Sequence, residues 1–283
     1  MQQQSIRLQA LRRYTDPIIL FAIVAVLWEK VVVIFHIKPY LLPPLSKVLE
    51  SMWVNKANLL LQSWITTQEV LAGFVLAVVL GIVLGLAIHG WFTLRRTLYP
   101  LIVVFQGVPK IALAPLMIIW FGYGDISKIL MAFMFAFFPV VIATMGGLAA
   151  TPANLVEHFR AIRAPARVMF TRLYVPAALP SILDGCKQAM PLAVIGAIVG
   201  EFVGSEHGLG HLILDTTANA RTDYLFAALI TVSIVAVNRT GNRGGCLVKV
   251  KQVPQPVLQV VDSNALQLRL AGCHRSIPIG AGG

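Results

Sequence analysis

Long apolar segments are the feature that most constrains the fold of this chain. Six of them follow one another, at residues 17–36, 68–89, 98–121, 129–148, 188–202 and 224–238. A helix needs about 20 mainly apolar residues to cross the hydrocarbon core of a bilayer. Charged residues make up only 12% of the chain, whereas a soluble domain has about a quarter. We therefore predict an all-α, polytopic membrane protein with about six transmembrane helices.

The connecting segments predict the orientation of the spans. Lys and Arg are twice as frequent in one alternate set of connections (1–16, 90–97, 151–187) as in the other (37–67, 122–128, 203–223). Cytoplasmic loops carry the excess of Lys and Arg, so the first set is predicted to be cytoplasmic, with both termini inside. The same rule accounts for the net charge of +11. Because the basic residues are scattered between apolar spans, we expect no nucleic-acid partner.

The chain divides into three predicted parts. Residues 1–16 form a cytoplasmic N-terminal segment, 17–238 the transmembrane domain, and 239–283 an atypical tail. No small-residue cleavage site follows the first apolar run, so we predict an uncleaved helix rather than a signal peptide. Residues 37–67 contain three prolines and a weakly amphipathic stretch, which predict an external loop with a short helix.

The sixth span is cut short. Its roughly 14 residues would cover only about 21 Å at 1.5 Å per residue. The segment 239–283 that follows is basic, rich in Gly and Pro, and without an apolar run long enough to span. We predict a disordered cytoplasmic tail. A change of reading frame in the gene and a divergent natural tail would both produce this pattern.

Residues 151–187 form the longest polar interruption between apolar segments and carry five basic residues against two acids. Their apolar residues recur at helical spacing. Pro165 should split the stretch into two short amphipathic helices, because proline removes a backbone donor and clashes with the preceding turn. The second helix should end near Tyr174, before Pro176. Such helices are too short to span and predict a docking surface.

The same stretch resembles a known family. Glu157-His-Phe-Arg-Ala161, the following Ile-Arg-Ala-Pro-Ala, and Tyr174-Val-Pro176-Ala-Ala-Leu-Pro180 resemble the "EAA" loop of ABC importer permeases. The longer sequence from Phe105-Gln-Gly-Val-Pro-Lys110 to Gly208-Leu-Gly210 resembles the nitrate, sulfonate and taurine branch of these permeases. The resemblance covers roughly residues 15–237.

The resemblance implies a set of residues that couple the spans to an ATPase: Glu157, Phe159, Arg160, Ala161, Arg163, Ala164, Pro176 and Pro180. Arg163 stands where the family usually has Gly. This departure bears on the tightness of the turn between the two loop helices, and hence on docking.

The resemblance also implies a function and partners. The chain would be the membrane-spanning subunit of an ABC importer in the bacterial inner membrane, for a small anion such as a sulfonate or nitrate. It would pair with a second copy, with separate ABC ATPase subunits, and with a periplasmic or lipid-anchored substrate-binding protein. The chain has no Gly-x-x-x-x-Gly-Lys-Ser/Thr loop, so we expect no ATPase activity of its own. No cofactor is expected. His207 and His211 have metal-ligand spacing, but the glycines between them break the helix that would align them, so no metal is expected.

Gln106, Lys110 and Glu201 are candidates for the substrate path. Lys110 lies about 18 Å into the third span at 1.5 Å per residue, and a charge at that depth faces protein or a water-filled path. Lys110 either attracts an anionic substrate or neutralises a carboxylate such as Glu29 on a neighbouring helix. Glu201, near the outer end of the fifth span, either lines the path or lies at the interface.

Glycines repeat every four residues in two spans, as Gly81 and Gly85 and as Gly196, Gly200 and Gly204. Such small-residue faces allow membrane helices to approach closely, so we interpret them as helix-packing surfaces.

Other classes of protein are less consistent with the sequence. A membrane-embedded enzyme would need several intramembrane ionisable groups, and only Glu29, Lys30 and Lys110 qualify by position. An ion-coupled secondary transporter would show internal repeats and more buried carboxylates. A damaged permease without transport activity is the alternative that the truncated sixth span raises.

Overall fold

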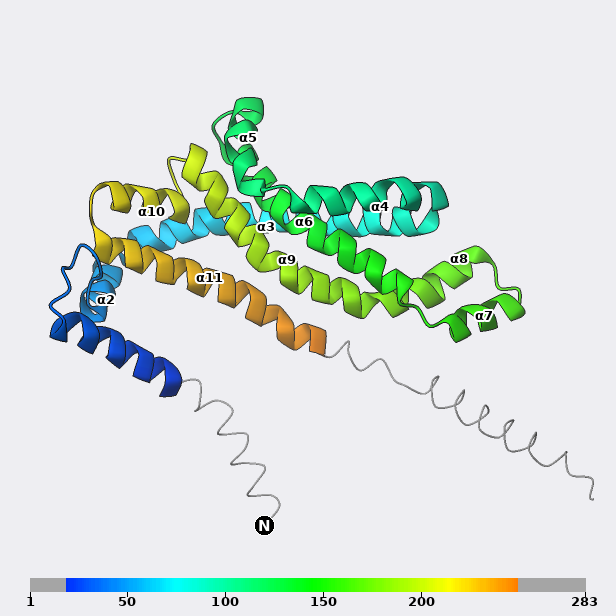
Figure 1. Cartoon of the computed structure of the whole chain (residues 1–283), viewed down its shortest axis with the longest axis horizontal. Helices are drawn as coiled ribbons and strands as arrows, with labels where there is room; N and C mark the ends of the chain where they lie inside the picture. The colour runs from blue at the N-terminus through cyan, green and yellow to red at the C-terminus, as the bar shows by residue number, and fades with distance from the viewer. Residues whose placement is uncertain (1–18, 249–283) are drawn as a thin grey trace, which may run out of the picture. The chain divides into compact units, whose positions relative to one another are not determined.

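The computed structural model describes residues 19–248, without the side chains of residues 92, 93, 95, 99 and 238–248. Within this range the chain is helical and contains no strand (Figure 1). A helix over residues 19–34 is followed by α2 (Leu45–Val54), α3 (Lys56–Gly90), α4 (Phe92–Gly107), the 3-10 turn η1 (Lys110–Leu113), α5 (Ala114–Phe121), α6 (Asp125–Ala149), α7 (Ala153–Ala161), α8 (Ala166–Met169), the π-helical segment η2 (Phe170–Tyr174), α9 (Val175–Gly204), α10 (Leu209–Ala218) and α11 (Thr222–Val248).

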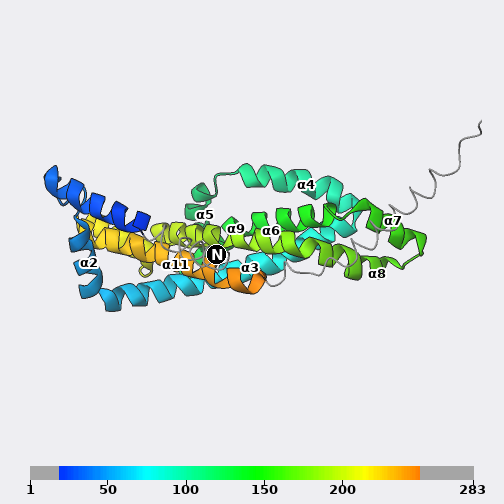
Figure 2. The same ribbon diagram turned by 90° about the horizontal axis from the view of Figure 1, so that it is seen from below.

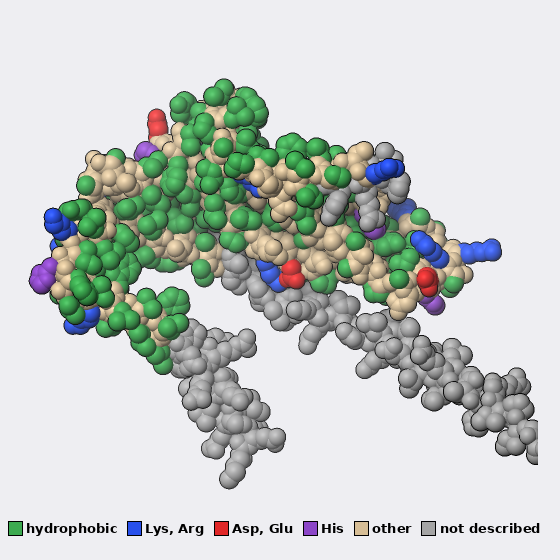
Figure 3. Space-filling model, viewed as in Figure 1, with side chains coloured by type: hydrophobic (Ala, Val, Ile, Leu, Met, Phe, Trp, Pro, Cys, Tyr) green, Lys and Arg blue, Asp and Glu red, His purple; other side chains and the backbone are tan. Residues whose placement is uncertain are grey.

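The helices have the lengths and composition of a polytopic membrane protein, which confirms the predicted fold class. Three described helices are long and apolar enough to cross a bilayer: Lys56–Gly90, Asp125–Ala149 and the continuous helix Ala166–Gly204. A fourth span is possible if the bent pair Arg96–Gly107 and Lys110–Phe121 counts as one. The shorter apolar helix Thr222–Val237 corresponds to the predicted sixth span. The visible face between the ends is mostly hydrophobic (Figure 3).

The segment 37–67, predicted as a loop with a short helix, contains that helix as α2 and is otherwise more helical than expected. Only the part that contains the prolines, before α2, is irregular, and α3 begins at Lys56, about three turns before the predicted span. Between residues 56 and 68 there is no Gly or Pro to end a helix. The polar residues there therefore do not interrupt α3. At the start of α2, Glu29 accepts hydrogen bonds from Ser46 N (3.1 Å) and Ser46 Oγ (2.9 Å).

The third predicted span is bent rather than straight. The helices Arg96–Gly107 and Lys110–Phe121 are inclined by 89° to each other. Val108 has extended angles (φ −68°, ψ 131°), as the residue before a proline prefers, and Pro109 has no N–H to continue the helix. Lys110 therefore begins a new arm and does not lie midway along one helix, as the sequence analysis assumed.

The core of the transmembrane domain is formed by α3, α6 and α9, which lie side by side (Figures 1 and 2). Small side chains line the contacts: Ala77, Ala132, Ala136, Ala189, Ala193 and Ala197 are fully buried. The glycines that were predicted to form helix-packing surfaces face α6 or a helix next to it. A Cβ added at Gly81 would lie 2.9 Å from Val140 Cγ1, and one at Gly196 would lie 2.7 Å from the Met131 carbonyl oxygen. Close backbone approach of this kind allows the van der Waals contact that holds membrane helices together.

A second apolar cluster joins α2 and the start of α3 to α10 and α11. Tyr224 is 3% exposed, and its hydroxyl accepts a hydrogen bond from Asn58 Nδ2 at 2.9 Å. Helix α11 continues to Val248, past residue 239, where the sequence analysis began the tail; that boundary stays a prediction. Residues 1–18 and 249–283 lie outside the described residues, so the N-terminal segment and most of the predicted tail stay predictions.

Candidate functional site

The loop between α6 and α9 contains the two short helices that the sequence predicted around Pro165. Helix α7 ends at Ala161, and α8 begins at Ala166, directly after Pro165. Glu157, Arg160 and Arg163 are exposed, and none of the ion pairs within the described part of the chain involves them. Ile162 lies between them with 61% of its side chain exposed. The loop thus presents charges without ion pairs and an apolar side chain at the surface.

The turn after α7 is built on a left-handed residue. Arg163 has φ 52°, a region that non-glycine residues enter at a cost because Cβ crowds the next carbonyl. Ala164 N donates to the Phe159 carbonyl oxygen at 3.0 Å, and Arg163 N to that of Arg160 at 2.9 Å. These bonds satisfy carbonyls at the helix end. The backbone turn is therefore the one that glycine favours, although the side chain is arginine.

The second loop helix does not end near Tyr174, contrary to prediction. Phe170–Tyr174 adopts π-helical hydrogen bonding and leads directly into α9, so that Ala166–Gly204 is one helix of 39 residues. Pro176 lies at the second position of α9. The wider turn ahead of it removes the clash and the lost hydrogen bond that made Pro176 look like a stop. Pro180 also lies within α9, and both prolines are exposed.

A ring contact joins this continuous helix to α3. The rings of His89 and Tyr174 meet edge to face, with centroids 4.9 Å apart. The contact ties the start of α9 to the end of α3.

Gln106 and Lys110 line one pocket, of about 260 Å³, at the bend between α4 and α5. Lys110 Nζ donates to the Gln106 carbonyl oxygen at 3.3 Å and lies 5.3 Å from the ring centroid of Phe138 and 6.0 Å from that of Phe135. Among the described residues no carboxylate forms an ion pair with Lys110. The suggested partner Glu29 bonds Ser46 instead. The pocket therefore offers a cation and aromatic faces with no acid to neutralise the charge.

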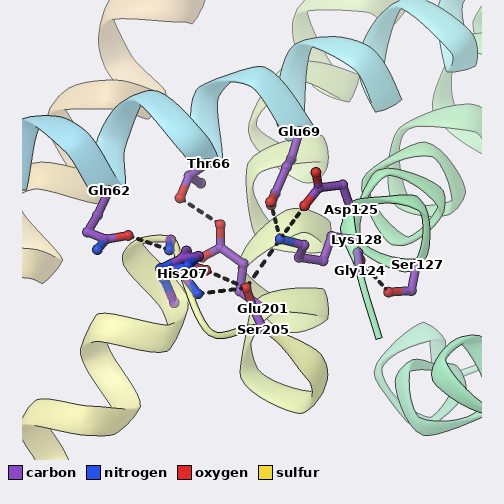
Figure 4. A network of polar contacts seen from close by, with 12 residues as sticks. Gln62, Thr66, Glu69, Gly124, Asp125, Ser127, Lys128, Glu201, Ser205 and His207 are labelled. Atoms are coloured by element: carbon purple, nitrogen blue, oxygen red, sulfur yellow. Dashed lines mark hydrogen bonds and ion pairs between the residues drawn. The ribbon is translucent and has the colours of Figure 1, made fainter. Parts of the chain in front are cut away.

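Glu201 does not line that pocket. It is 1% exposed and bridges α3 and α10 (Figure 4). Its Oε1 accepts from Thr66 Oγ1 at 2.6 Å, and its Oε2 accepts from Gly210 N at 2.5 Å. A Cβ at Gly210 would lie 2.8 Å from Glu201 Oε2, so glycine is required for this approach. The Gly208-Leu-Gly210 turn lets the start of α10 reach the carboxylate.

A buried ion pair lies beside Glu201 and joins the core helices. Lys128 Nζ on α6 is 2.5 Å from Glu69 Oε1 on α3 and 3.0 Å from Asp125 Oδ1, and it donates to Ser205 Oγ at 3.2 Å (Figure 4). Glu69 and Lys128 are 3% and 4% exposed, whereas the Asp125 side chain is 78% exposed. We call Glu69, Lys128, Glu201, Thr66 and Ser205 the polar network.

The polar network and the α7–α8 loop lie at opposite ends of the core helices. Glu201 is 26 residues beyond Val175, the start of α9, or about 39 Å along the helix at 1.5 Å per residue. Asp125 begins α6, and Ala149 at its other end leads into α7.

Comparison with known proteins assigns the family. The family described as "binding-protein-dependent transport system inner membrane component" matches residues 77–238. The chain belongs to this family. The matched segment contains the loop, the Lys110 pocket and all of the polar network except Thr66 and Glu69. It ends at Asn238, where the sequence changes character.

Curated relatives of the permease extend over most of its length. A formylaminopyrimidine transport permease protein of Halalkalibacterium halodurans is 35% identical over 223 residues, which cover 78% of this chain and 89% of that protein. The taurine transport system permease protein of Escherichia coli is 28% identical over 239 residues, covering 80% of this chain and 84% of that protein. The permease therefore has relatives of the branch that the sequence resembled, with differing named substrates.

A solved structure shares the fold of the permease. The MetNI methionine ABC transporter, in an inward-facing conformation, aligns with a TM-score of 0.60 at 19% identity, covering 70% of this chain and 97% of that one. This similarity supports the membrane-protein fold.

Sequence reasoning missed the ionisable residues of the polar network other than Glu201. Lys128 was assigned to an external turn, and Glu69 was not counted among intramembrane ionisable groups; both are buried in the permease. A signal was present in the spacing of Gln62, Thr66 and Glu69, which puts three polar side chains on one face of a helix. All three contact other elements: Gly208 N donates to Gln62 Oε1 at 2.6 Å, Leu209 N to Thr66 Oγ1 at 2.9 Å, and Lys128 pairs with Glu69.

Proposed function

We propose that this permease is the membrane-spanning subunit of an ABC importer in the bacterial inner membrane, and that it carries a small organic anion such as a sulfonate. Two copies form the path, a separate ATPase docks on residues 151–187, and a periplasmic or lipid-anchored binding protein delivers the substrate. The family description names binding-protein-dependent transport, which favours this function over ion-coupled transport or a membrane-embedded enzyme.

The observation that carries the coupling role is the unbroken helix from the loop into the core. Ala166–Gly204 joins the exposed loop to the contacts of α9 with α6 and α3 without a break. A force on α8 is therefore applied to a helix that reaches across the bilayer. The exposed Glu157 and arginines supply contacts for a partner of mixed charge.

The observation that carries the substrate class is the unneutralised Lys110. Its ammonium group faces a pocket of about 260 Å³, and attraction for an anion is strong where the surroundings have a low dielectric constant. Taurine, named for one relative, is a small sulfonate of suitable size. The faces of Phe135 and Phe138 favour a second candidate, an aromatic heterocycle such as the formylaminopyrimidine named for another relative.

Uptake measurements separate the two candidates. The permease is expressed with candidate ATPase and binding-protein subunits, and uptake of taurine and of formylaminopyrimidine is measured. Lys110→Met should lower anion uptake by about tenfold or more, since a charge-assisted hydrogen bond contributes about 1.5–3 kcal/mol. Lys187→Met, which removes an equal charge from an exposed pair with Asp184, is the matched control.

Three outcomes are informative. Equal uptake by Lys110→Met and wild type would refute the anion path. Loss of heterocycle uptake in Phe138→Leu, with taurine not transported at all, would select the second candidate. Absence of both ATPase copurification and uptake in the wild-type protein would refute the importer function.

A further inference from the structure

An exposed apolar stripe runs along most of α3. It begins at Leu60 and Trp64, which are 71% and 59% exposed. Exposed residues then recur every three or four positions as far as Val83, and all of them are apolar except Gln68. The rise from Leu60 to Val83 is about 35 Å at 1.5 Å per residue, which matches a hydrocarbon core of about 30 Å when the helix is tilted. The stripe therefore has the length and composition of a lipid-facing surface.

A lysine stacked on an aromatic ring lies at the first end of this stripe. Lys56 is about one turn before Leu60 on α3, and its Nζ lies 4.1 Å from the ring centroid of Trp53 on α2. Trp53 is 73% exposed. Tryptophan is enriched where the hydrocarbon core meets the headgroups, and lysine lays its stem along apolar surface while its ammonium group reaches the polar layer. The pair is thus of the kind found at the level of lipid headgroups.

The segment around this pair is unusually basic for its predicted side of the membrane. Residues 37–67, predicted to be external, hold three lysines against one acid: Lys38, Lys47, Lys56 and Glu50. All four are exposed, and no ion pair within the described part of the chain joins one of these lysines to a carboxylate. Basic side chains are visible at this end of the molecule in Figure 3. Since Lys and Arg are favoured on the cytoplasmic side, the orientation of the spans does not explain this excess, which is available to an anion.

The buried side of α2 fixes the direction in which its exposed side points. Val48 on α2 is 0% exposed and Leu59 on α3 is 4% exposed, and both belong to the apolar cluster with α10 and α11. Before α2, the carbonyl oxygen of Pro43 accepts a hydrogen bond from Trp28 Nε1 at 3.2 Å. These contacts hold the segment against the rest of the fold. The ring of Trp53 and the ammonium group of Lys56 are therefore presented outward without a need for rearrangement.

We propose that α2 and the first turns of α3 bind the headgroup of an anionic phospholipid, such as phosphatidylglycerol, in the outer leaflet. The ammonium group of Lys56 donates to the lipid phosphate, Lys47 adds attraction for the negative charge, and an acyl chain lies along Leu60 and Trp64. A soluble protein can cover α2, but not a stripe that continues across the depth of a bilayer, so we assign the surface to lipid. The inference rests on the membrane-protein fold and does not depend on the proposed transport function.

Quenching of tryptophan fluorescence by brominated lipid tests this site in the full-length protein. The purified protein is reconstituted into mixed vesicles of phosphatidylcholine and phosphatidylglycerol, with bromine on the chains of one lipid or of the other. The difference in fluorescence between the wild-type protein and Trp53→Phe isolates the signal of Trp53. We expect phosphatidylglycerol to be enriched beside Trp53 by about fivefold over its share of the vesicle lipid, which is the attraction expected of one lysine near an anionic surface.

Variants of the charged residues, each measured with and without Trp53→Phe, show whether Lys56 causes the enrichment. Lys56→Met should abolish it and Lys56→Arg should keep it, while Glu50→Gln should raise it. Lys187→Met, which removes an equal charge from an exposed pair with Asp184, is the matched control and should keep the full enrichment.

Three results would overturn the proposal. Equal quenching by the two brominated lipids in the wild-type protein would mean that the lysines select no headgroup and are free for a protein partner. Absence of quenching of Trp53 by either lipid would mean that a second copy of the chain covers this face. Full enrichment in Lys56→Met would assign the preference to another part of the surface.

Discussion

The two ends of α9 use charged side chains in opposite ways. At the start, the α7–α8 loop exposes Glu157, Arg160 and Arg163 without ion pairs between them. At the far end, Glu201 and the neighbouring Glu69–Lys128 pair are buried and bonded to other helices. Exposed charges are available to a separate molecule, whereas buried charges must find partners within the chain. The comparison separates an end whose charges are available at the surface from an end whose polar groups form internal contacts.

The buried end should be the most sensitive to loss of a single charge. Lys128→Met leaves Glu69 buried without its counter-ion, which should destabilise the protein by about 3–5 kcal/mol. Thermal unfolding of the purified protein in detergent measures this. Lys187→Met, which breaks the exposed pair with Asp184, should change stability by about 0–1 kcal/mol. Equal effects of the two variants would remove the distinction between buried and exposed charges.

In the middle of α9, stability should depend on the volume of the side chains rather than on their charge. Gly196→Ala places a methyl group 2.7 Å from the Met131 carbonyl oxygen, and overpacking of this kind costs about 1–3 kcal/mol. Gly90→Ala is the matched control, because a Cβ there meets nothing within 4 Å. Unfolding midpoints of the two variants in the same detergent give the comparison. A Gly196→Ala protein as stable as wild type would show that α6 and α9 approach less closely than described.

Substitutions at the exposed end should change ATPase docking and leave the stability of the fold unchanged. Glu157→Lys adds a like charge beside Arg160 and should weaken ATPase docking by about tenfold, or about 1.4 kcal/mol, with an unchanged unfolding temperature. Copurification of the ATPase at increasing salt measures the docking. Arg172→Glu, also exposed but in the π-helical segment, tests whether the position of the charge matters. Undiminished copurification and uptake in Glu157→Lys would locate docking elsewhere.

The smallest effect is expected in the turn after α7. Arg163→Gly relieves the left-handed conformation, worth about 1–2 kcal/mol for a residue with a Cβ, but glycine loses about 0.5–1 kcal/mol in chain entropy. A net stabilisation below about 1 kcal/mol should result, with tighter ATPase docking as the more sensitive measurement. Weaker docking in Arg163→Gly would mean that the guanidinium group itself contacts the ATPase.

The prolines show how far the sequence could predict the helices. Pro165 separated two helices as predicted, Pro176 did not end one, and Pro109 marked a sharp bend within a predicted straight span. Pro139 lies inside α6 without a break. The outcome depends on whether the preceding turn can widen, as η2 does, and on neighbours such as Gly107. Those are properties of the folded helix and not of the proline alone.

The candidate site was predicted where it is local in sequence. The loop residues and the pair Gln106 and Lys110 lie within a few turns of each other, so motif and spacing placed them together. Lys128 and Glu69 are 59 residues apart, and their contact depends on how α3 crosses α6. No periodicity within either helix contains that information, although the unusual polar residues on α3 indicated a buried face.

The continuous helix Ala166–Gly204 has a mechanical consequence. At 1.5 Å per residue, its 39 residues extend about 58 Å, so a tilt of about 5° about one end would carry the other by about 5 Å. That distance exceeds the separation of any bonded pair in the polar network. A small rotation of the end that carries the α7–α8 loop would therefore become, at the other end, a displacement large enough to separate the bonded side chains of the polar network.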